Sequence, residues 1–263
     1  MTLKISLLVF TIVSGLGQQT AVQDPNAFGL AIATEVDRRS RGYGDMQAEL
    51  FMILRNSRGQ ESRRRMRIQN LEVKGDGDRS LCIFLEPPDI KDTALLTHEH
   101  PKAEDDQWLY MPALRRVKRI SAANKASSFV GSEFSYEDIG GQQLEKYSYR
   151  YLDQEVLDGN DCFVIERRPL DLRNSGYSRE KVWIDRSEYR IWKVEYYDRK
   201  GSLLKTLTIG GYRLYKDRFW RPDVMEMVNH QTGKSTRLVW SEYRFGVGLE
   251  EEDLSTNVLL RIR

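Results

Sequence analysis

The strongest constraint on the fold is an alternation of apolar and polar residues that begins at residue 45 and reads DMQAELFMIL. Successive side chains of a β-strand point to opposite faces, whereas the apolar residues of a surface helix recur every three or four positions. Residues 45–54 are therefore predicted to form a strand with one buried face. The apolar residues that share this face are Met46, Ala48, Leu50, Met52 and Leu54.

The same pattern recurs along most of the chain. Short segments rich in Gly, Asp and Asn separate the strand-like runs, as at residues 56–59, 75–78 and 158–160, and such segments are typical of turns. We expect about ten or eleven antiparallel strands in up-and-down order, more than a flat sheet holds without curling. Beyond the first, the predicted strands are residues 63–73, 80–86, 115–119, 147–151, 162–167, 182–185, 190–197, 203–215, 219–229 and 236–245.

Two helices are predicted beside this sheet. Asp24 followed by Pro25 is typical of a helix start, so residues 25–39 form an amphipathic helix, and a short helix follows Ser135. These helices are too small to fill a curled sheet of this size. The sequence therefore predicts a mainly β fold, a barrel or half-barrel with an apolar cavity. The apolar face of the first helix consists of Phe28, Ile32 and Val36.

The N-terminus is typical of a secretory signal peptide. Lys4 precedes an apolar run over residues 5–13, and small residues follow, so cleavage is expected after Gly17 or as late as Ala21. The run is shorter than the ~20 residues that span a membrane, and no Cys stands near the cut to carry a lipid. We expect residues 1–17 to be removed and residues 18–263 to form one soluble domain in the periplasm. A buried first helix is the alternative.

The net charge and the cysteine content limit the classes of protein to which this chain can belong. The formal net charge is +2, which gives no bulk attraction to nucleic acid. Cys82 and Cys162 are the two cysteines, and each lies in an apolar, strand-like run. An oxidising compartment would allow them to pair, whereas two buried thiols are the alternative.

Three motifs carry a resemblance to a known family. Residues 108–120 read WLYMPALRRVKRI, residues 129–138 read FVGSEFSYED, and residues 182–185 read VWID. With the β-rich sequence around them, from about residue 37 to the end, the chain resembles the outer-membrane lipoprotein-sorting family, longer relatives of the LolA-type periplasmic lipoprotein carriers. The resemblance implies an unclosed antiparallel β-barrel covered by helices, whose hydrophobic interior holds acyl chains. The family's acyl-gating arginine does not align with a particular residue among Arg38, Arg39, Arg41 and Arg55.

The predicted ligand-binding residues are large apolar side chains in the strands and in the motifs that carry the resemblance. Burial of an acyl chain gains ~0.8 kcal/mol per methylene, and Met side chains adapt to varied shapes. For each residue, packing in an ordinary core is the alternative. The predicted cavity lining is Leu50, Met52, Met66, Trp108, Tyr110 and Met111.

Residues 129–139 are predicted to form a lid over the cavity mouth. Phe129, Phe134 and Tyr136 provide its apolar side chains, and Ser135 with Asp138 forms a capping box that starts a short helix. Glu133 and Glu137 are expected to pair with a basic run that follows Pro112. A fixed helix that plugs the core is the alternative. The basic run consists of Arg115, Arg116, Lys118 and Arg119.

This basic run is predicted to contact anionic headgroups or an acidic partner, with a solvated strand face as the alternative; a second run lies at residues 63–67. His98, Glu99 and His100 are followed by Pro101 and lack the spacing of a zinc motif, so no metal, cofactor or catalytic residue is predicted.

The favoured function is a periplasmic carrier of lipid or lipoprotein acyl chains. It would touch membranes transiently and exchange cargo with an inner-membrane transporter. A lipid-responsive regulator of the same fold and an unrecognised hydrolase are the alternatives.

Overall fold

The computed structural model describes residues 24–262, so the predicted signal peptide lies outside the described residues. One long helix, α1 (Pro25–Ser40), opens this part of the chain as predicted, because the Asp24 carboxylate accepts hydrogen bonds from the N–H groups of Asn26 and Ala27. None of the helices between residues 24 and 262 has the length and apolar content needed to cross a membrane.

Thirteen strands form one antiparallel sheet. Its spatial order is β6-β5-β4-β3-β2-β1-β15-β14-β11-β10-β9-β8-β7, and β12 and β13 form a separate hairpin. The strands are β1 (Asp45–Arg55), β2 (Glu61–Leu71), β3 (Arg79–Glu86), β4 (Ala94–His98), β5 (Asp106–Met111), β6 (Arg116–Ile120), β7 (Tyr147–Leu157), β8 (Asn160–Pro169), β9 (Tyr177–Asp185), β10 (Ile191–Asp198), β11 (Leu203–Gly210), β12 (Arg213–Tyr215), β13 (Phe219–Arg221), β14 (Val224–Asn229) and β15 (Ser235–Phe245).

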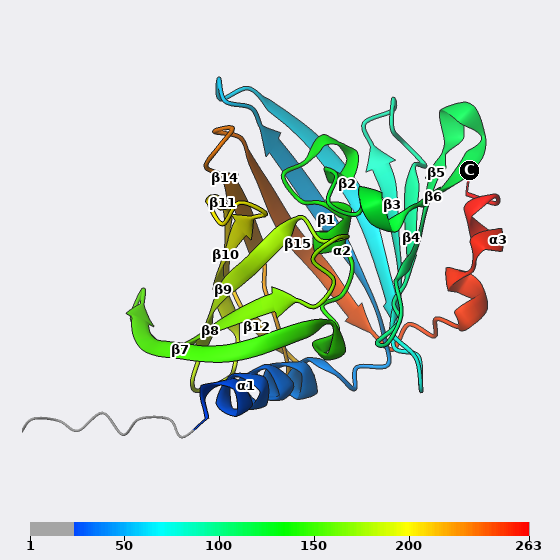
Figure 1. The fold of residues 1–263 in the computed structure, drawn as a ribbon. Coiled ribbons are helices and arrows are strands. Elements are labelled where there is room, and N and C mark those ends of the chain that lie inside the picture. Colours follow the sequence, from blue (N-terminus) through cyan, green and yellow to red (C-terminus); the bar gives the residue numbers. More distant parts are fainter. Residues whose placement is uncertain (1–23, 263) are drawn as a thin grey trace, which may run out of the picture.

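This topology confirms the predicted unclosed, curled sheet, since β6 and β7 remain as two separate edges (Figure 1). The predicted up-and-down order is wrong at one place, because β1 pairs with the last strand, β15, and β6 and β7 lie at opposite edges. The strands β4 and β5 were not predicted. The single strands expected at 203–215 and 219–229 are each interrupted, at Gly211 and at Pro222.

Residues 121–146 cross from the β6 edge to the β7 edge over the inner face of the sheet, and α2 lies within the curl in Figure 1. The capping box at Ser135 and Asp138 is confirmed. The inner-face core includes Phe84, Phe129 and Ile165 and also receives Ile32 from α1. The remaining helical elements are α2 (Tyr136–Ile139) and α3 (Thr256–Leu259), with 3-10 turns η1 (Pro112–Leu114), η2 (Ala122–Asn124), η3 (Phe129–Gly131), η4 (Leu144–Lys146) and η5 (Glu251–Leu254).

The outer face of the sheet has its own apolar clusters. Leu254 and Leu259 of the C-terminal segment pack on the outer side of β3, β4 and β5, where α3 lies in Figure 1. Cys162 belongs to a third cluster on the outer side of β8, whereas Cys82 points into the inner core. Both cysteines are buried and free. The pairing alternative is therefore wrong, because the sheet separates the two thiols.

Candidate functional site

A cavity lies between α1 and the inner face of the sheet. It has a volume of 410 Å³, and we call it the helix cavity. One wall is aliphatic, because every second residue of β8 and β9 points inward and meets the apolar side of α1. Binding pockets for small ligands usually measure about 300–1,000 Å³, so this volume suits a ligand. The aliphatic wall consists of Ala33, Val36, Met46, Leu144, Ile165, Val182, Ile184 and Ile191.

A second hollow of 510 Å³, the hairpin cavity, lies where α1 faces the β12–β13 hairpin. Val36, Ser40, Ile191 and Arg221 line both cavities, so the two are direct neighbours. The additional apolar side chains of the hairpin cavity are Tyr189, Ile209, Tyr212, Trp220, Pro222 and Met225.

Buried carboxyl groups form the polar end of the helix cavity. Burial raises the pKa of Glu99 to about 7, with Asp78 and Asp105 adding to the effect. Burial also raises the pKa of Asp78, to about 6, against the opposing effect of Arg41. Gln143 donates a hydrogen bond to Glu99, and Arg41 Nη1 lies 3.8 Å from Asp78 Oδ1. These carboxyl groups change protonation near neutral pH.

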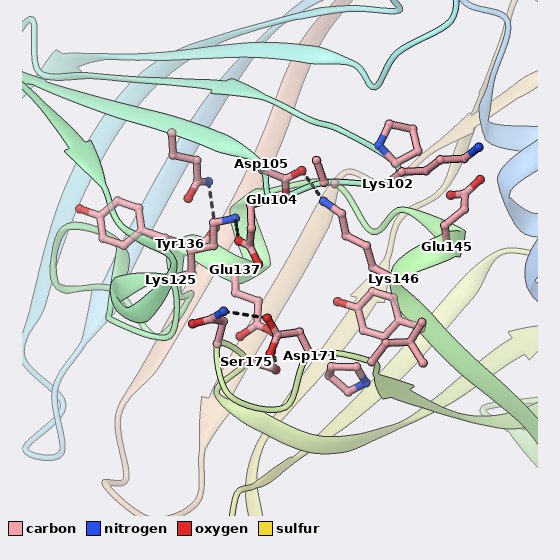
Figure 2. A pocket seen from close by; sticks show the side chains of 18 residues that line it. Lys102, Glu104, Asp105, Lys125, Tyr136, Glu137, Glu145, Lys146, Asp171 and Ser175 are labelled. Atoms are coloured by element: carbon pink, nitrogen blue, oxygen red, sulfur yellow. Dashed lines mark hydrogen bonds and ion pairs between the residues drawn. The ribbon is translucent and has the colours of Figure 1, made fainter.

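A third pocket, of 480 Å³, lies between the β4–β5 loop, the crossing segment 121–146 and the start of β7 (Figure 2). Two pairs of its charged side chains form ion pairs: Lys125 with Glu104 at 2.8 Å, and Lys146 with Asp105. Glu137 accepts hydrogen bonds from Ser175 Oγ at 2.5 Å and from the Gly176 N–H at 2.9 Å. Burial nevertheless raises the pKa of Glu137 to about 7. The Ser175 hydroxyl and the Gly176 N–H thus hold the Glu137 carboxyl group in place.

Residues 129–139, which we call the plug, fill the inner face beside these cavities. Phe129 is 1% exposed and its ring centroid lies 5.8 Å from that of Phe84. Polar contacts fasten the plug to several strands, because Lys205 Nζ lies 2.6 Å from Asp138 Oδ2 and Tyr177 Oη donates to Asp138 Oδ1 at 2.8 Å. The buried Asp138 and Lys205 therefore neutralise each other inside the fold.

Arg64 fastens the other end of the plug. Its Nη1 donates a hydrogen bond of 2.6 Å to the carbonyl oxygen of Val130, and its guanidinium lies over the Phe84 ring at 5.8 Å. Val130 itself has a left-handed backbone conformation, with φ of 46°. The sequence gave no indication of this contact, because 66 residues separate the two partners.

Known structures share this architecture. A domain described as an outer membrane lipoprotein-sorting protein from Vibrio parahaemolyticus is 52% identical, with a TM-score of 0.88 over 90% of this chain and 100% of that one. The chain belongs to the outer-membrane lipoprotein-sorting family. A DUF1329 family protein from Desulfovibrio piger is 29% identical, with a TM-score of 0.85 over 90% of this chain and 99% of that one.

A LolA superfamily protein from Nitrosomonas europaea shares the fold of this lipoprotein-sorting family member at 21% identity. The TM-score is 0.71 over 88% of this chain and 98% of that one. A family model whose description reads "Uncharacterized protein" matches residues 76–261. A comparison with curated proteins finds no match. The family membership and the LolA-like half-barrel expected from the sequence are thus confirmed.

Within this family member, the predicted lining residues divide between the two faces of the sheet. Leu50, Met52 and Met66 are buried on the inner face, beneath the plug. Trp108 and Tyr110 pack on the outer face with the C-terminal segment. The expectation that all of them line one cavity is wrong, because strand alternation sends Trp108 and Tyr110 away from the interior while Leu109 points inward. Met111 is partly buried at the end of β5.

The plug residues and the basic run also have defined places in this sorting-family fold. Phe129, Phe134 and Tyr136 lie together in the inner core. The predicted pairing of Glu133 and Glu137 with the basic run is wrong, because Glu133 accepts from Asn229 Nδ2 at 2.7 Å and Glu137 accepts from residues 175 and 176. The basic side chains are exposed at the β6 edge, where one of them, Arg119, pairs with Asp106; the others are Arg115, Arg116 and Lys118.

The two histidines of the His-Glu-His triplet at the end of β4 make structural contacts in this family member. His98 Nε2 lies 2.7 Å from the carbonyl oxygen of Leu254, and His100 Nδ1 lies 3.0 Å from Asp76. Within residues 24–262, no group of three or more metal-binding side chains comes together.

Sequence reasoning missed most residues of the two cavities next to α1. Val36, which belongs to the predicted apolar face of α1, does line both cavities. The strand residues Ile165, Val182 and Ile191 each have an apolar neighbour in the sequence, namely Val164, Trp183 or Trp192, that belongs to the outer cluster. Because both faces of these strands are apolar there, alternation did not mark which side chains point into the cavity.

Proposed function

We propose that this protein is a periplasmic carrier that binds the acyl chain of a lipid or lipoprotein in the helix and hairpin cavities. The observation that carries the proposal is the pair of neighbouring cavities, of 410 and 510 Å³, with an aliphatic wall. Each methylene that leaves water for such a wall contributes about 0.8 kcal/mol to binding. The family name of the 52% identical relative, lipoprotein sorting, supports the same cargo.

The proposal includes export and transfer. The sequence features of residues 1–17 support cleavage of a signal peptide, and residues 18–263 would act as one lipid-binding domain. Cargo would pass to or from an inner-membrane transporter, and the exposed basic edge at β6 suits brief contact with anionic headgroups. Cell fractionation tests the location: an uncleaved chain in the cytosol would contradict it.

Filling the cavity tests the binding site. Val36 lines both cavities, so Val36→Trp should occupy space that the acyl chain needs. We expect this variant to bind a fluorescent fatty acid at least about tenfold more weakly, a loss of about 1.4 kcal/mol. Leu30→Trp is the matched control, because Leu30 lies on the same helix and is 47% exposed.

Two outcomes would contradict the proposal. One is a Val36→Trp variant that folds normally by circular dichroism and binds the fatty acid as tightly as the parent protein. The other is a parent protein that yields no lipid by organic extraction and mass spectrometry and binds no fatty acid.

A further inference from the structure

The arginines that line the two cavities differ in their partners. Five of them pair with carboxylates: Arg38 and Arg39 with Glu35, Arg41 with Asp37, Arg167 with Glu180 and Arg190 with Asp185. Within residues 24–262, two others, Arg218 and Arg221, form no ion pair.

Arg221 stands at the junction of the helix and hairpin cavities. Its Nη1 donates to the carbonyl oxygen of Trp220 at 3.0 Å, and its Nη2 donates to the carbonyl oxygen of Ser40 at 3.1 Å. A guanidinium has five N–H donors, so these two bonds leave donors for another acceptor. Glu72 is the acidic side chain that influences it from a distance, but its carboxylate oxygens accept the N–H groups of Gly42 and Gly44.

The surroundings of Arg221 make its positive charge costly. Its guanidinium lies 5.3 Å from the ring centroid of Tyr43 and 5.7 Å from that of Phe245. Arg221 is partly buried, and burial lowers its pKa because the charge loses part of its contact with water. Contacts with aromatic rings offset part of that cost, but an anion would offset more of it.

Arg218 stands beside it on the exposed side of the hairpin cavity. Its Nη2 donates to the carbonyl oxygen of Arg41 at 3.2 Å, next to the Ser40 carbonyl that Arg221 binds. Both guanidinium groups therefore meet at the C-terminal end of α1, and both line the hairpin cavity. Anchoring α1 accounts for these carbonyl contacts, and the negative end of the helix dipole favours both cations. Among the described residues neither guanidinium pairs with a carboxylate, although Glu188, which pairs with Arg39, and Asp217 also line the hairpin cavity.

We propose that Arg221, assisted by Arg218, binds the phosphate or carboxylate headgroup of an acidic lipid whose acyl chain lies in the hairpin cavity. Charge-assisted hydrogen bonds from a guanidinium fork to such an oxyanion are stronger than bonds between neutral groups. The apolar side chains within reach of the tail are Val36, Ile191, Ile209 and Met225. The inference rests on the proposed carrier function and adds the charge class of its cargo.

Calorimetric titration of the mature protein with three probes tests the headgroup site. The probes are dodecyl phosphate, dodecanol and inorganic phosphate, which supply the headgroup with the chain, the chain alone and the anion alone. We expect dodecyl phosphate to bind about tenfold more tightly than dodecanol, and inorganic phosphate to bind far more weakly than either. In Arg221→Gln, dodecyl phosphate should lose this advantage over dodecanol.

Two further variants complete the test. Arg218→Gln should lose part of the advantage, and because Arg218 is exposed this variant keeps the test valid if Arg221→Gln does not fold. Arg58→Gln is the matched control, since Arg58 is exposed in the β1–β2 turn, and its affinities should equal those of the parent.

The outcomes separate this inference from the carrier function. Equal binding of dodecyl phosphate and dodecanol by the parent protein overturns the headgroup site but leaves the carrier function standing. An unchanged preference in both Arg221→Gln and Arg218→Gln also overturns the site. Binding of inorganic phosphate as tight as that of dodecyl phosphate indicates a site for a free anion and overturns the lipid assignment. Failure of both dodecyl probes to bind contradicts the carrier function as well.

Discussion

Replacement of Glu99 by Gln should change how stability depends on pH. Glu99 is 8% exposed, and its carboxyl group accepts a hydrogen bond from Gln143 Nε2. Burial, together with the nearby Asp78, raises its pKa from 4.5 to about 7. Glutamine has nearly the same shape but no charge, so it resembles the protonated acid.

The direction of this pH dependence follows from how many protons the folded and the unfolded states bind. Between pH 4.5 and 7 the folded state keeps the Glu99 proton and the unfolded state releases it, so stability falls as pH rises through this window and is flat above it. A pKa shift of this size corresponds to a free energy of about 3 kcal/mol, at ~1.4 kcal/mol for each pKa unit. Glu99→Gln should therefore match the parent near pH 4.5 and exceed its stability by up to about 3 kcal/mol above pH 7.

Urea unfolding at several values between pH 5 and 8 measures this difference. The free energy of unfolding of the parent should decline over the range, and the decline should be smaller in Glu99→Gln. It should not vanish, because Glu137 and Asp78 also have raised pKa values, of about 7 and about 6. The exposed Glu252→Gln is the control and should follow the parent curve. A parent whose stability rises from pH 5 to 7, or a Glu99→Gln variant with the parent's slope, would refute the reasoning.

Three further changes test the plug and the outer cluster. Phe129→Ala should lower the free energy of unfolding by about 3–5 kcal/mol, because Phe129 is 1% exposed. Phe51 is 42% exposed, and a loss no larger than that caused by Phe51→Ala would contradict the packing of the plug. Lys205→Met should cost about 3–5 kcal/mol by leaving the buried Asp138 without its cation, and adding Asp138→Asn should recover part of it in urea unfolding. Trp108→Ala should reduce stability yet keep fatty-acid affinity within about twofold, because Trp108 packs on the outer face; a parallel loss of affinity would place it at the ligand.

Local sequence determined the elements of this fold. Asp24 and Pro25 set the start of α1, and the Ser135–Asp138 pair set the start of α2, because capping needs only groups a few residues apart. The alternation in residues 45–54 likewise predicted β1, since side-chain direction in a strand repeats every two residues. Curling of the sheet followed from the number of strands.

Pairings between distant strands were decided by the tertiary structure. β1 pairs with β15, about 190 residues away in the chain, and no local pattern specifies that partner. The short β4 escaped prediction because its burial pattern is nearly continuous, with no polar alternation to mark it.

The position of a site also depended on the tertiary structure. No strand was predicted at Trp108 and Tyr110, whereas the alternation in residues 45–54 placed Leu50 and Met52 on one face of a strand. Strand pairing and the curl of the sheet decided that the first pair points outward and the second inward. Arg221 became a candidate ligand-binding residue because the fold places it between two cavities and away from the carboxylates that pair with its neighbours. Alternation is a local property of the backbone, whereas the environment that a side chain meets depends on segments far away in the sequence.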